Sequence, residues 1–300
     1  MAGKHKSKDK HRDKDHKDKD QKKDAGKSDS KEKQKSKPKG DTRLIVMRHG
    51  ERLDRVFPSW LRDSMRTGFY QPYDLNQPLS IATRGDFRDY ENDPPITEMG
   101  AVSAQMVARA MKLVGAKPTV IYCSPAMRCV QTATHVWKTI GPDKDSRKIK
   151  VEPGLFEWLA WYPSGPKFLS IKEMVDLGWP VDTKHKELIP REMLKKQLVK
   201  ETCQEYMKRS HLANPGETVL VVAHAPTLDS ARYLVKRNCK EVVENDMFSL
   251  GQNYPYVSSI VLEGSTADPK SWRWPRNEDL IPCMSMLDST SRPNYDVFDR

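Results

Sequence analysis

Short apolar runs alternate with amphipathic stretches in the part of the chain beyond residue 41. Three of these runs are rich in Val, Ile and Leu, a composition typical of buried strands, and they lie at 42–47, 119–123 and 218–222. One more strand is expected at 256–262. Short apolar strands that alternate with helices predict an α/β fold, in which a mostly parallel central sheet has helices on both faces.

Three helices are expected between these strands. The first begins after Thr97, a candidate N-cap, and its apolar stripe would consist of Val102, Met106, Ala110 and Leu113. The second spans about 126–140 and ends where Gly and Pro follow in the sequence. The third has Pro226 in its first turn and continues to about residue 234.

The first 40 residues differ from the rest in composition. They hold 16 Lys or Arg and 8 Asp or Glu, so they carry +8 of the total charge of +11 and leave only +3 for residues 41–300. Their only aliphatic residues are Met1, Ala2 and Ala25, too few to form a core, and we expect 1–40 to be a disordered Lys-rich tail. The nearly balanced charge of the remainder argues against nucleic acid as a specific partner.

Residues 41–300 suit one domain with insertions at about 53–96 and 155–216, where periodicity is weak. We expect the insertions to build walls over a site at the strand ends. The chain has no apolar run long enough for a transmembrane segment and does not start with a signal peptide. Its five cysteines are scattered and form no Cys-x-x-Cys pair, which favours reduced thiols in the cytosol or nucleus.

Two histidines follow buried strands. His49 comes shortly after the run at 42–47, and His224 shortly after the run at 218–222. Ligands of open parallel sheets bind beyond the carboxyl ends of the strands. We therefore expect the two imidazoles to face each other across one pocket.

Three arginines are expected at the same edge of the sheet. Arg48 and Arg52 flank His49, and Arg128 follows the second strand near the start of its helix. The guanidinium fork matches phosphate oxygens, and a helix N-terminus favours anions. Because three such cations would repel one another in an empty pocket, the cluster predicts a site for a phosphoryl group.

The combination of imidazoles and guanidinium groups suits phosphoryl transfer. A neutral imidazole such as His49 can attack phosphorus and form a phosphohistidine, and the leaving oxygen then needs a proton from a carboxylic acid outside the cationic cluster. Glu157 is the candidate acid, with Glu51 and Glu152 as alternatives. The nearby aromatic residues Phe156, Trp158 and Trp161 would remove water from the carboxyl of Glu157 and raise its pKa toward neutrality.

The motif Arg-His-Gly-Glu at 48–51 resembles the signature of the phosphoglycerate mutase-like histidine phosphatases. Longer segments resemble one branch of this superfamily, which contains the suppressor of T-cell receptor signalling phosphatases and the insect ecdysteroid-phosphate phosphatases. These segments are RHGERLDRVF (48–57), FRDYENDPPIT (87–97), YCSPAMRCVQTA (122–133) and VEPGLFEW (151–158). The similarity extends from about residue 42 to about 285.

The resemblance implies a role for each of the candidate residues. The nucleophile falls on His49 and the acid on Glu157, while the phosphate-binding residues fall on Arg48, Arg52, Arg128 and His224. It also implies an α/β sandwich with the site at the strand ends, catalysis without a metal or other cofactor, and a homodimer. The implied activity is a phosphomonoesterase acting on phosphotyrosine in proteins or on a small organic phosphate.

Two other functions remain open. A phosphoglycerate mutase would return the phosphoryl group to a sugar acid, but Arg52 stands where mutases of the family usually have Ser, which argues against it. A phosphate-binding scaffold with vestigial hydrolysis is the other alternative, and the complete set of His, Arg and Glu counts against it. The residues Trp158, Trp161 and Tyr162 either form a pocket wall for an aromatic leaving group or pack beneath the insertion.

Overall fold

The computed structural model describes residues 42–141, 148–197, 217–235, 244–265, 268, 270–276, 280–286 and 289–296. All of these belong to one unit of the chain, Pro38–Arg300. The predicted tail at 1–40 and the end of the second predicted insertion lie outside the described residues. No helix in the described ranges is long and apolar enough to cross a membrane.

Five strands form the central sheet in the order β3-β2-β4-β1-β5. They are β1 (Thr42–Arg48), β2 (Val120–Cys123), β3 (Ile149–Val151), β4 (Thr218–Ala223) and β5 (Ser259–Gly264). The first four are parallel, and β5 pairs with β1 in the antiparallel direction at one edge. The fold is therefore α/β with a mostly parallel sheet, as the sequence predicts. A small hairpin follows, formed by β6 (Ser285–Met286) and β7 (Ser289–Thr290).

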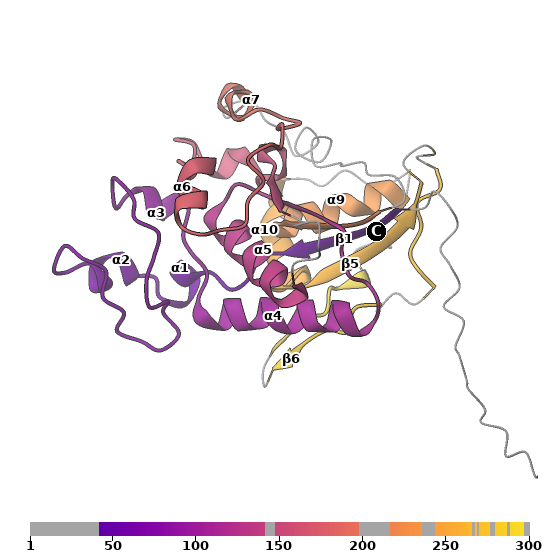
Figure 1. Cartoon of the computed structure of the whole chain (residues 1–300), viewed down its shortest axis with the longest axis horizontal. Helices are drawn as coiled ribbons and strands as arrows, with labels where there is room; N and C mark the ends of the chain where they lie inside the picture. The colour runs from indigo at the N-terminus through magenta and orange to yellow at the C-terminus, as the bar shows by residue number, and fades with distance from the viewer. Residues whose placement is uncertain are drawn as a thin grey trace, which may run out of the picture. The chain divides into compact units, whose positions relative to one another are not determined.

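Helices connect the strands and cover the sheet (Figure 1). They are α1 (Leu53–Val56), α2 (Trp60–Ser64), α3 (Asp89–Asn92), α4 (Glu98–Leu113), α5 (Met127–Ile140), α6 (Ile171–Asp176), α7 (Arg191–Gln197), α9 (Ala225–Val235), α10 (Glu244–Asn253) and the short 3₁₀ helices η1 (Pro153–Leu155) and η2 (Leu159–Trp161). The three predicted helices correspond to α4, α5 and α9. Thr97 is the N-cap of α4, since its hydroxyl accepts a hydrogen bond of 3.0 Å from the N–H of Gly100.

The central strands are buried on both faces because successive side chains point in opposite directions. In β4, Leu220 and Val222 pack in the core that contains α4 and α5, whereas Val219 and Val221 pack in the core that contains α9 and α10. All six residues of β4 are buried. This two-sided burial explains why the strands are continuous apolar runs rather than alternating ones.

The predicted apolar stripe of α4 was wrong. Val102, Met106 and Leu113 are exposed, Leu113 by 85%, and the buried face consists of Gly100, Ala101, Ser103, Ala104, Val107, Ala108 and Met111. Many of these residues are small, which lets α4 lie close against α5. The face of α4 that contacts α5 is thus the one with small side chains, and the larger apolar side chains Val102, Met106 and Leu113 lie on the exposed face.

The strand predicted at 256–262 begins later, at Ser259. Residues 255–258 form a turn in which the N–H of Ser258 donates to the carbonyl of Pro255. Val257 has a φ of 54°, a left-handed conformation that a β-branched residue adopts only under strain. The turn brings Tyr256 to the carboxyl end of β1 instead of continuing the sheet.

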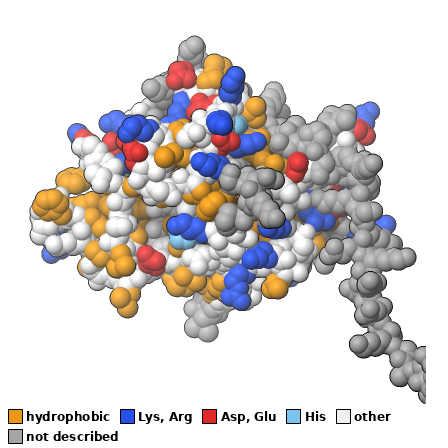
Figure 2. Space-filling view, in the orientation of Figure 1, with side chains coloured by type: hydrophobic (Ala, Val, Ile, Leu, Met, Phe, Trp, Pro, Cys, Tyr) orange, Lys and Arg blue, Asp and Glu red, His pale blue; other side chains and the backbone are white. Residues whose placement is uncertain are grey.

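The segment predicted as the first insertion, 53–96, contains α1, α2 and α3. Several of its large apolar side chains are exposed, among them Phe69 (78%), Leu75 (98%) and Leu79 (87%). In Figure 2, hydrophobic side chains gather over the end of the molecule where Figure 1 places α1 and α2. Only a few residues of this segment reach the cavity described below.

Gly50 lies against the first turn of α4. A Cβ atom at position 50 would lie 2.8 Å from the carbonyl oxygen of Gly100, and a Cβ atom at position 100 would lie 2.8 Å from the backbone nitrogen of Glu51. Both contacts involve backbone atoms, which cannot rotate out of the way. Two glycines are thus needed for the close approach of the helix to the turn after β1.

Gly50→Ala is expected to lower the free energy of unfolding by about 1–3 kcal/mol, because α4 must shift to accept the methyl group. Urea denaturation would measure the change. Gly85→Ala is the matched control, since a Cβ atom at position 85 meets nothing within 4 Å. Similar losses for the two variants would show that the close approach is not the cause.

Candidate active site

The two predicted histidines lie together at the carboxyl end of the parallel strands. His49 follows β1 and His224 follows β4, and these strands are neighbours with Arg48 opposite Ala223. The ring centroids of His49 and His224 are 5.4 Å apart in an edge-on arrangement. Both side chains are buried. The predicted meeting of the two imidazoles is confirmed.

A hydrogen bond orients the ring of His49. Its Nδ1 lies 2.8 Å from the carbonyl oxygen of Gly50, which can only accept. Nδ1 therefore carries the proton, and the lone pair is on Nε2. Burial lowers the pKa of His49 well below its usual value, and the charges of Arg128 and Arg48 lower it further. The ring is thus neutral at pH 7, the form that can attack phosphorus.

Two of the arginines are held in place by fixed acceptors. Nη1 of Arg48 donates to the carbonyl oxygens of Gly251 (2.8 Å) and Tyr254 (2.6 Å), and its guanidinium lies 4.3 Å above the ring of Tyr256. Arg52 makes a fork to the carboxylate of Asp54, with distances of 2.9 and 2.7 Å. The positive charge is therefore oriented before any phosphate arrives.

Arg128, in the first turn of α5, is completely buried. Its Nη2 donates to the carboxylate of Glu157 and lies 3.4 Å from both the hydroxyl of Tyr162 and Nδ1 of His224. Its Nε and Nη1 have no hydrogen-bond partner among the described residues. Oδ1 of Asp93 lies 4.0 Å from Nη1, so two carboxylates share the charge of this buried guanidinium.

His224 is oriented from the opposite side by Ser124. Nε2 of His224 lies 2.8 Å from the hydroxyl of Ser124, while Nδ1 faces Arg128. Nδ1 of His224 also lies 3.6 Å from Oε2 of Glu157, so this edge of the ring faces both the guanidinium and the carboxylate. Ser124 directly follows β2, so three neighbouring strands contribute to the site.

Glu157 lies inside the cationic cluster and not outside it, which corrects the sequence-based expectation. Burial raises its pKa, as expected from the aromatic neighbours, but Arg128, Arg52 and a hydrogen bond from Tyr162 outweigh burial, so its pKa is lowered. Glu157 is therefore ionised at neutral pH in the free protein. Neutralisation of the arginines by a bound phosphoryl group would raise the pKa of Glu157 again.

The alternative carboxylates have structural contacts. Glu51 accepts hydrogen bonds from the side chains of Thr97 (2.7 Å) and Asn76 (3.1 Å). Glu152 accepts from the backbone N–H groups of Gly154 (3.2 Å), Leu188 (2.8 Å) and Ile189 (3.0 Å). Neither lines the cavity that contains His49. Glu157 is therefore the best-placed acid.

His49, Arg48, Arg52 and Glu157 line a cavity of about 800 Å³, whereas His224 and Arg128 are completely buried and do not line it. Both predicted insertions contribute to it: Arg55, Glu91 and Asn92 from the first, and Glu157, Trp161 and Tyr162 from the second. Trp161 faces Phe248 of α10 at a ring distance of 5.9 Å. Trp158, in contrast, is buried in the core beside α9 and α10. The sequence did not decide whether Trp158, Trp161 and Tyr162 form a pocket wall or pack in the core. Trp161 and Tyr162 line the cavity, and Trp158 packs in the core.

Several site residues were not recognised from the sequence. Tyr256 contacts both Arg48 and His49, and Asp54 holds Arg52. Asp93 lies 4.0 Å from Arg128 and forms a buried ion pair with Arg84, to which the sequence had assigned no chemistry. Asp54 and Asp93 lie within the segments that resemble the phosphatases, and only this position in the sequence could have pointed to a role in the site.

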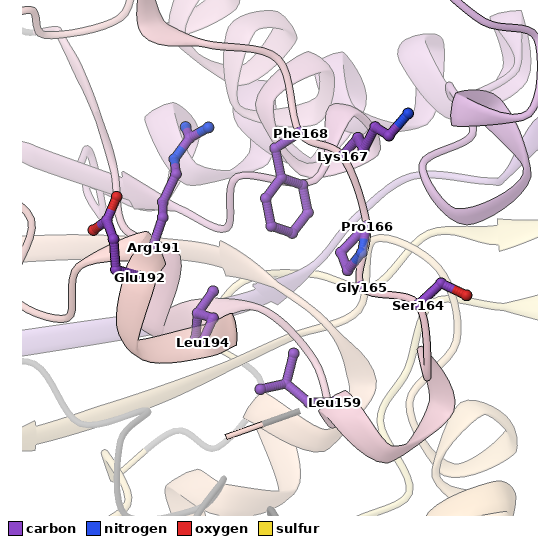
Figure 3. A pocket seen from close by; sticks show the side chains of 9 residues that line it. All are labelled: Leu159, Ser164, Gly165, Pro166, Lys167, Phe168, Arg191, Glu192 and Leu194. Atoms are coloured by element: carbon purple, nitrogen blue, oxygen red, sulfur yellow. The ribbon is translucent and has the colours of Figure 1, made fainter. Parts of the chain in front are cut away.

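A second cavity, of about 590 Å³, lies between the loop after η2 and α7 (Figure 3). Leu159, Phe168 and Leu194 point toward its interior, while Lys167 and Glu192 point away. None of the predicted site residues lines it. Among the described residues, no group of three or more His, Cys, Asp or Glu side chains could hold a metal ion.

Comparisons with known proteins agree with this geometry. A profile of the histidine phosphatase superfamily (branch 1) matches residues 84–274. The chain belongs to this superfamily. The profile spans α4, the strands β2 to β5 and the residues Arg128, Glu157 and His224.

Individual relatives match at moderate identity. The ecdysteroid-phosphate phosphatase of Drosophila melanogaster is 36% identical over 230 residues, 74% of this chain and 30% of the relative. The human ubiquitin-associated and SH3 domain-containing protein B is 36% identical over 67% of this chain and 33% of the relative. This histidine phosphatase chain thus spans about a third of the length of these relatives.

A solved structure shares the fold. It is the crystal structure of the ecdysone phosphate phosphatase of Bombyx mori in complex with tungstate, with a TM-score of 0.64 and 29% identity. The match covers 85% of this chain and 99% of the other. The described architecture is therefore shared with a solved member of this superfamily over nearly the whole length of that structure.

Proposed function

We propose that the chain is a phosphomonoesterase that needs no metal and works through a phosphohistidine at Nε2 of His49. The observation that carries the proposal is the neutral ring of His49, whose Nε2 keeps a free lone pair because Nδ1–H donates to the carbonyl of Gly50, beside the charges of Arg48 and Arg128. The relatives named as phosphatases support it, and so does the tungstate bound by the Bombyx mori enzyme, because tungstate is a tetrahedral oxyanion like phosphate.

Arg48, Arg52, Arg128 and His224 would bind the three non-bridging oxygens of the phosphoryl group. Nε2 of His49 attacks phosphorus in line, and the bond to the leaving oxygen breaks. That oxygen takes the proton of Glu157, which is protonated once the phosphoryl charge has drawn Arg128 away from it. In the second half, Glu157 takes a proton from water, the hydroxide attacks phosphorus, and phosphate and neutral His49 are released.

The substrate class follows from the cavity. Its volume of about 800 Å³ far exceeds the space of a phosphate, and Trp161, Phe248 and Pro226 form an apolar wall beside the polar floor. Such a wall favours a bulky or aromatic leaving group over a sugar acid. We therefore propose phosphotyrosine or a bulky small-molecule phosphate as substrate, and not the substrate of a mutase.

The test is a substrate panel assayed in the presence of EDTA. It contains a phosphotyrosine peptide, a steroid phosphate, p-nitrophenyl phosphate, glycerol 3-phosphate and 3-phosphoglycerate. Higher kcat/KM for the first three and no interconversion of phosphoglycerates are expected. Mutase activity would replace the proposal by the phosphotransferase alternative, and turnover at background for every compound would favour a phosphate-binding scaffold.

We extend the proposal to the assembly and location of the chain. The family resemblance supports a homodimer, which sedimentation of the purified chain would test. Cys123, Cys129 and Cys283 are free thiols in the described part of the chain, which fits the reducing cytosol or nucleus.

A further inference from the structure

Arg128 has a second carboxylate neighbour besides Glu157. Oδ1 of Asp93 lies 4.0 Å from Nη1 of Arg128, on the side of the guanidinium away from the donor Nη2 that Glu157 occupies. Arg128 and Asp93 are both buried, with side-chain exposures of 0% and 1%. The catalytic carboxylate and Asp93 therefore compete for one buried cation.

Asp93 itself is held from two directions. Its Oδ2 accepts from Nη2 of Arg84 at 2.5 Å in an ion pair that is almost completely buried. Its Oδ1 accepts from the backbone N–H of Met127 at 2.6 Å. Met127 is the first residue of α5, whose N-cap residue, Ala126, makes no side-chain cap bond. Asp93 thus caps the helix that carries Arg128, although it is distant in the sequence.

The segment that contains Asp93 also contacts the other half of the site. The N–H of Ile96 donates to the side chain of Gln131 on α5, and the carbonyl of Pro95 accepts from the N–H of Leu53. Arg52 forms an isolated bridge with Ile96. One short stretch of backbone thus sets the separation between the turn after β1 and the start of α5.

We propose that Asp93, held by Arg84, is a positioning residue that draws Arg128 away from Glu157 and fixes the start of α5, the helix that presents Arg128 to the phosphoryl group. The proposal rests on the proposed function and deepens it. It assigns a role in catalysis to a buried ion pair that lies outside the cavity. Its physical basis is that both carboxylates attract the same guanidinium. A stronger attraction between Asp93 and Arg128 weakens the ion pair between Glu157 and Arg128, and a weaker attraction strengthens that ion pair.

Two substitutions change this competition in opposite directions. Asp93→Asn keeps an acceptor for the N–H of Met127 but removes the negative charge, so the ion pair between Arg128 and Glu157 becomes stronger. Arg84→Met removes the cation that shares Asp93, so Asp93 attracts Arg128 more strongly. The groups that face Glu157 are otherwise unchanged in both variants, namely Arg48, His49, Arg52, Arg128, Tyr162 and His224.

The first readout is the pH profile of kcat with phenyl phosphate, whose poor leaving group needs the proton of Glu157. Activity is lost on the alkaline side when Glu157 ionises. Asp93→Asn is expected to move this limb to lower pH and Arg84→Met to higher pH, each by about 0.5–1 unit, the scale on which one neighbouring charge shifts a pKa. A merely structural role predicts losses of activity without shifts of opposite sign.

The second readout is the dissociation constant of orthovanadate, measured by calorimetry. Asp93→Asn makes the pocket more positive, so electrostatics alone predicts tighter binding of this oxyanion. Positioning predicts weaker binding, by about fivefold or more, because Arg128 stays with Glu157. Glu263→Gln is the control, since it breaks an ion pair with Arg43 (2.9 Å) at the opposite end of β1, and it should leave both readouts unchanged.

The double variant Arg84→Met/Asp93→Asn removes both members of the buried ion pair and leaves neither charge unpaired. It should therefore fold even if a single variant does not. Its vanadate affinity should also be below that of the wild type. Tight vanadate binding by folded Asp93→Asn, or limbs that move in the same direction in the two single variants, would overturn the inference. Vanadate binding does not require turnover. If the proposed phosphatase activity is wrong, the wild type will show no turnover, and this result is separate from the effect of the variants on vanadate binding.

Discussion

His49→Ala is expected to lower kcat for p-nitrophenyl phosphate by roughly 10³–10⁶-fold, the range seen when an enzyme loses its nucleophile. The physical reason is that Nε2 of His49 carries a free lone pair, lines the cavity and lies beside the charges of Arg48 and Arg128. Rapid acid-free quenching should trap a phosphoenzyme in the wild type whose bond is labile in acid and stable in alkali, as expected for a phosphoramidate. The variant should form none.

The arginines and His224 remain in His49→Ala, so vanadate should still bind. His135→Ala is the matched control: His135 is an imidazole on α5 that contacts Gln105 at 3.2 Å and does not line the cavity. It should retain turnover within about threefold, as is usual for substitutions away from a site. Residual turnover in His49→Ala equal to that of His135→Ala would assign the nucleophile elsewhere.

Glu157→Gln is expected to slow phenyl phosphate by about 10²–10⁴-fold and p-nitrophenyl phosphate by about tenfold or less, because a good leaving group needs little protonation. The amide retains an acceptor for Arg128 and Tyr162, so the change isolates the proton. The measurement is the ratio of kcat values for the two substrates. The alkaline limb of the wild-type profile with phenyl phosphate should be absent in the variant.

Glu51→Gln serves as the control for Glu157→Gln, since it also neutralises a carboxylate beside the site while keeping an acceptor for Thr97. It should leave the ratio between the two substrates unchanged. The pH dependence has a definite sign: His49 must be neutral and Glu157 protonated, and the pKa of each is lowered in the free protein. Activity on poor leaving groups should therefore be greatest on the acid side of neutrality. Equal losses on both substrates in Glu157→Gln would remove Glu157 from the acid role.

Four of the five sheet strands, three helices and the meeting of the two histidines could be predicted from the sequence because each depends on local pattern. The three-residue strand β3 was not predicted. A parallel strand buried on both faces is a continuous apolar run, and residues that follow such strands, here His49 and His224, meet at one edge of the sheet. The three arginines were found for the same reason, since each lies within a few residues of a strand end.

The balance of charge in the pocket was decided only by the tertiary structure. Glu157 was expected to be a raised-pKa acid outside the cations, yet folding places it against Arg128, and the ion pair outweighs burial. Asp93 reaches the same arginine from a loop more than thirty residues away in sequence, and no periodic pattern encodes such a contact. The buried face of α4 likewise depends on how closely α5 approaches. The identity of the main strands and the candidate chemistry follow from neighbours along the chain. The strand order, the direction of a pKa shift and the buried face of a helix depend on neighbours in space, because electrostatic and packing energies are set by distances that only the folded chain defines.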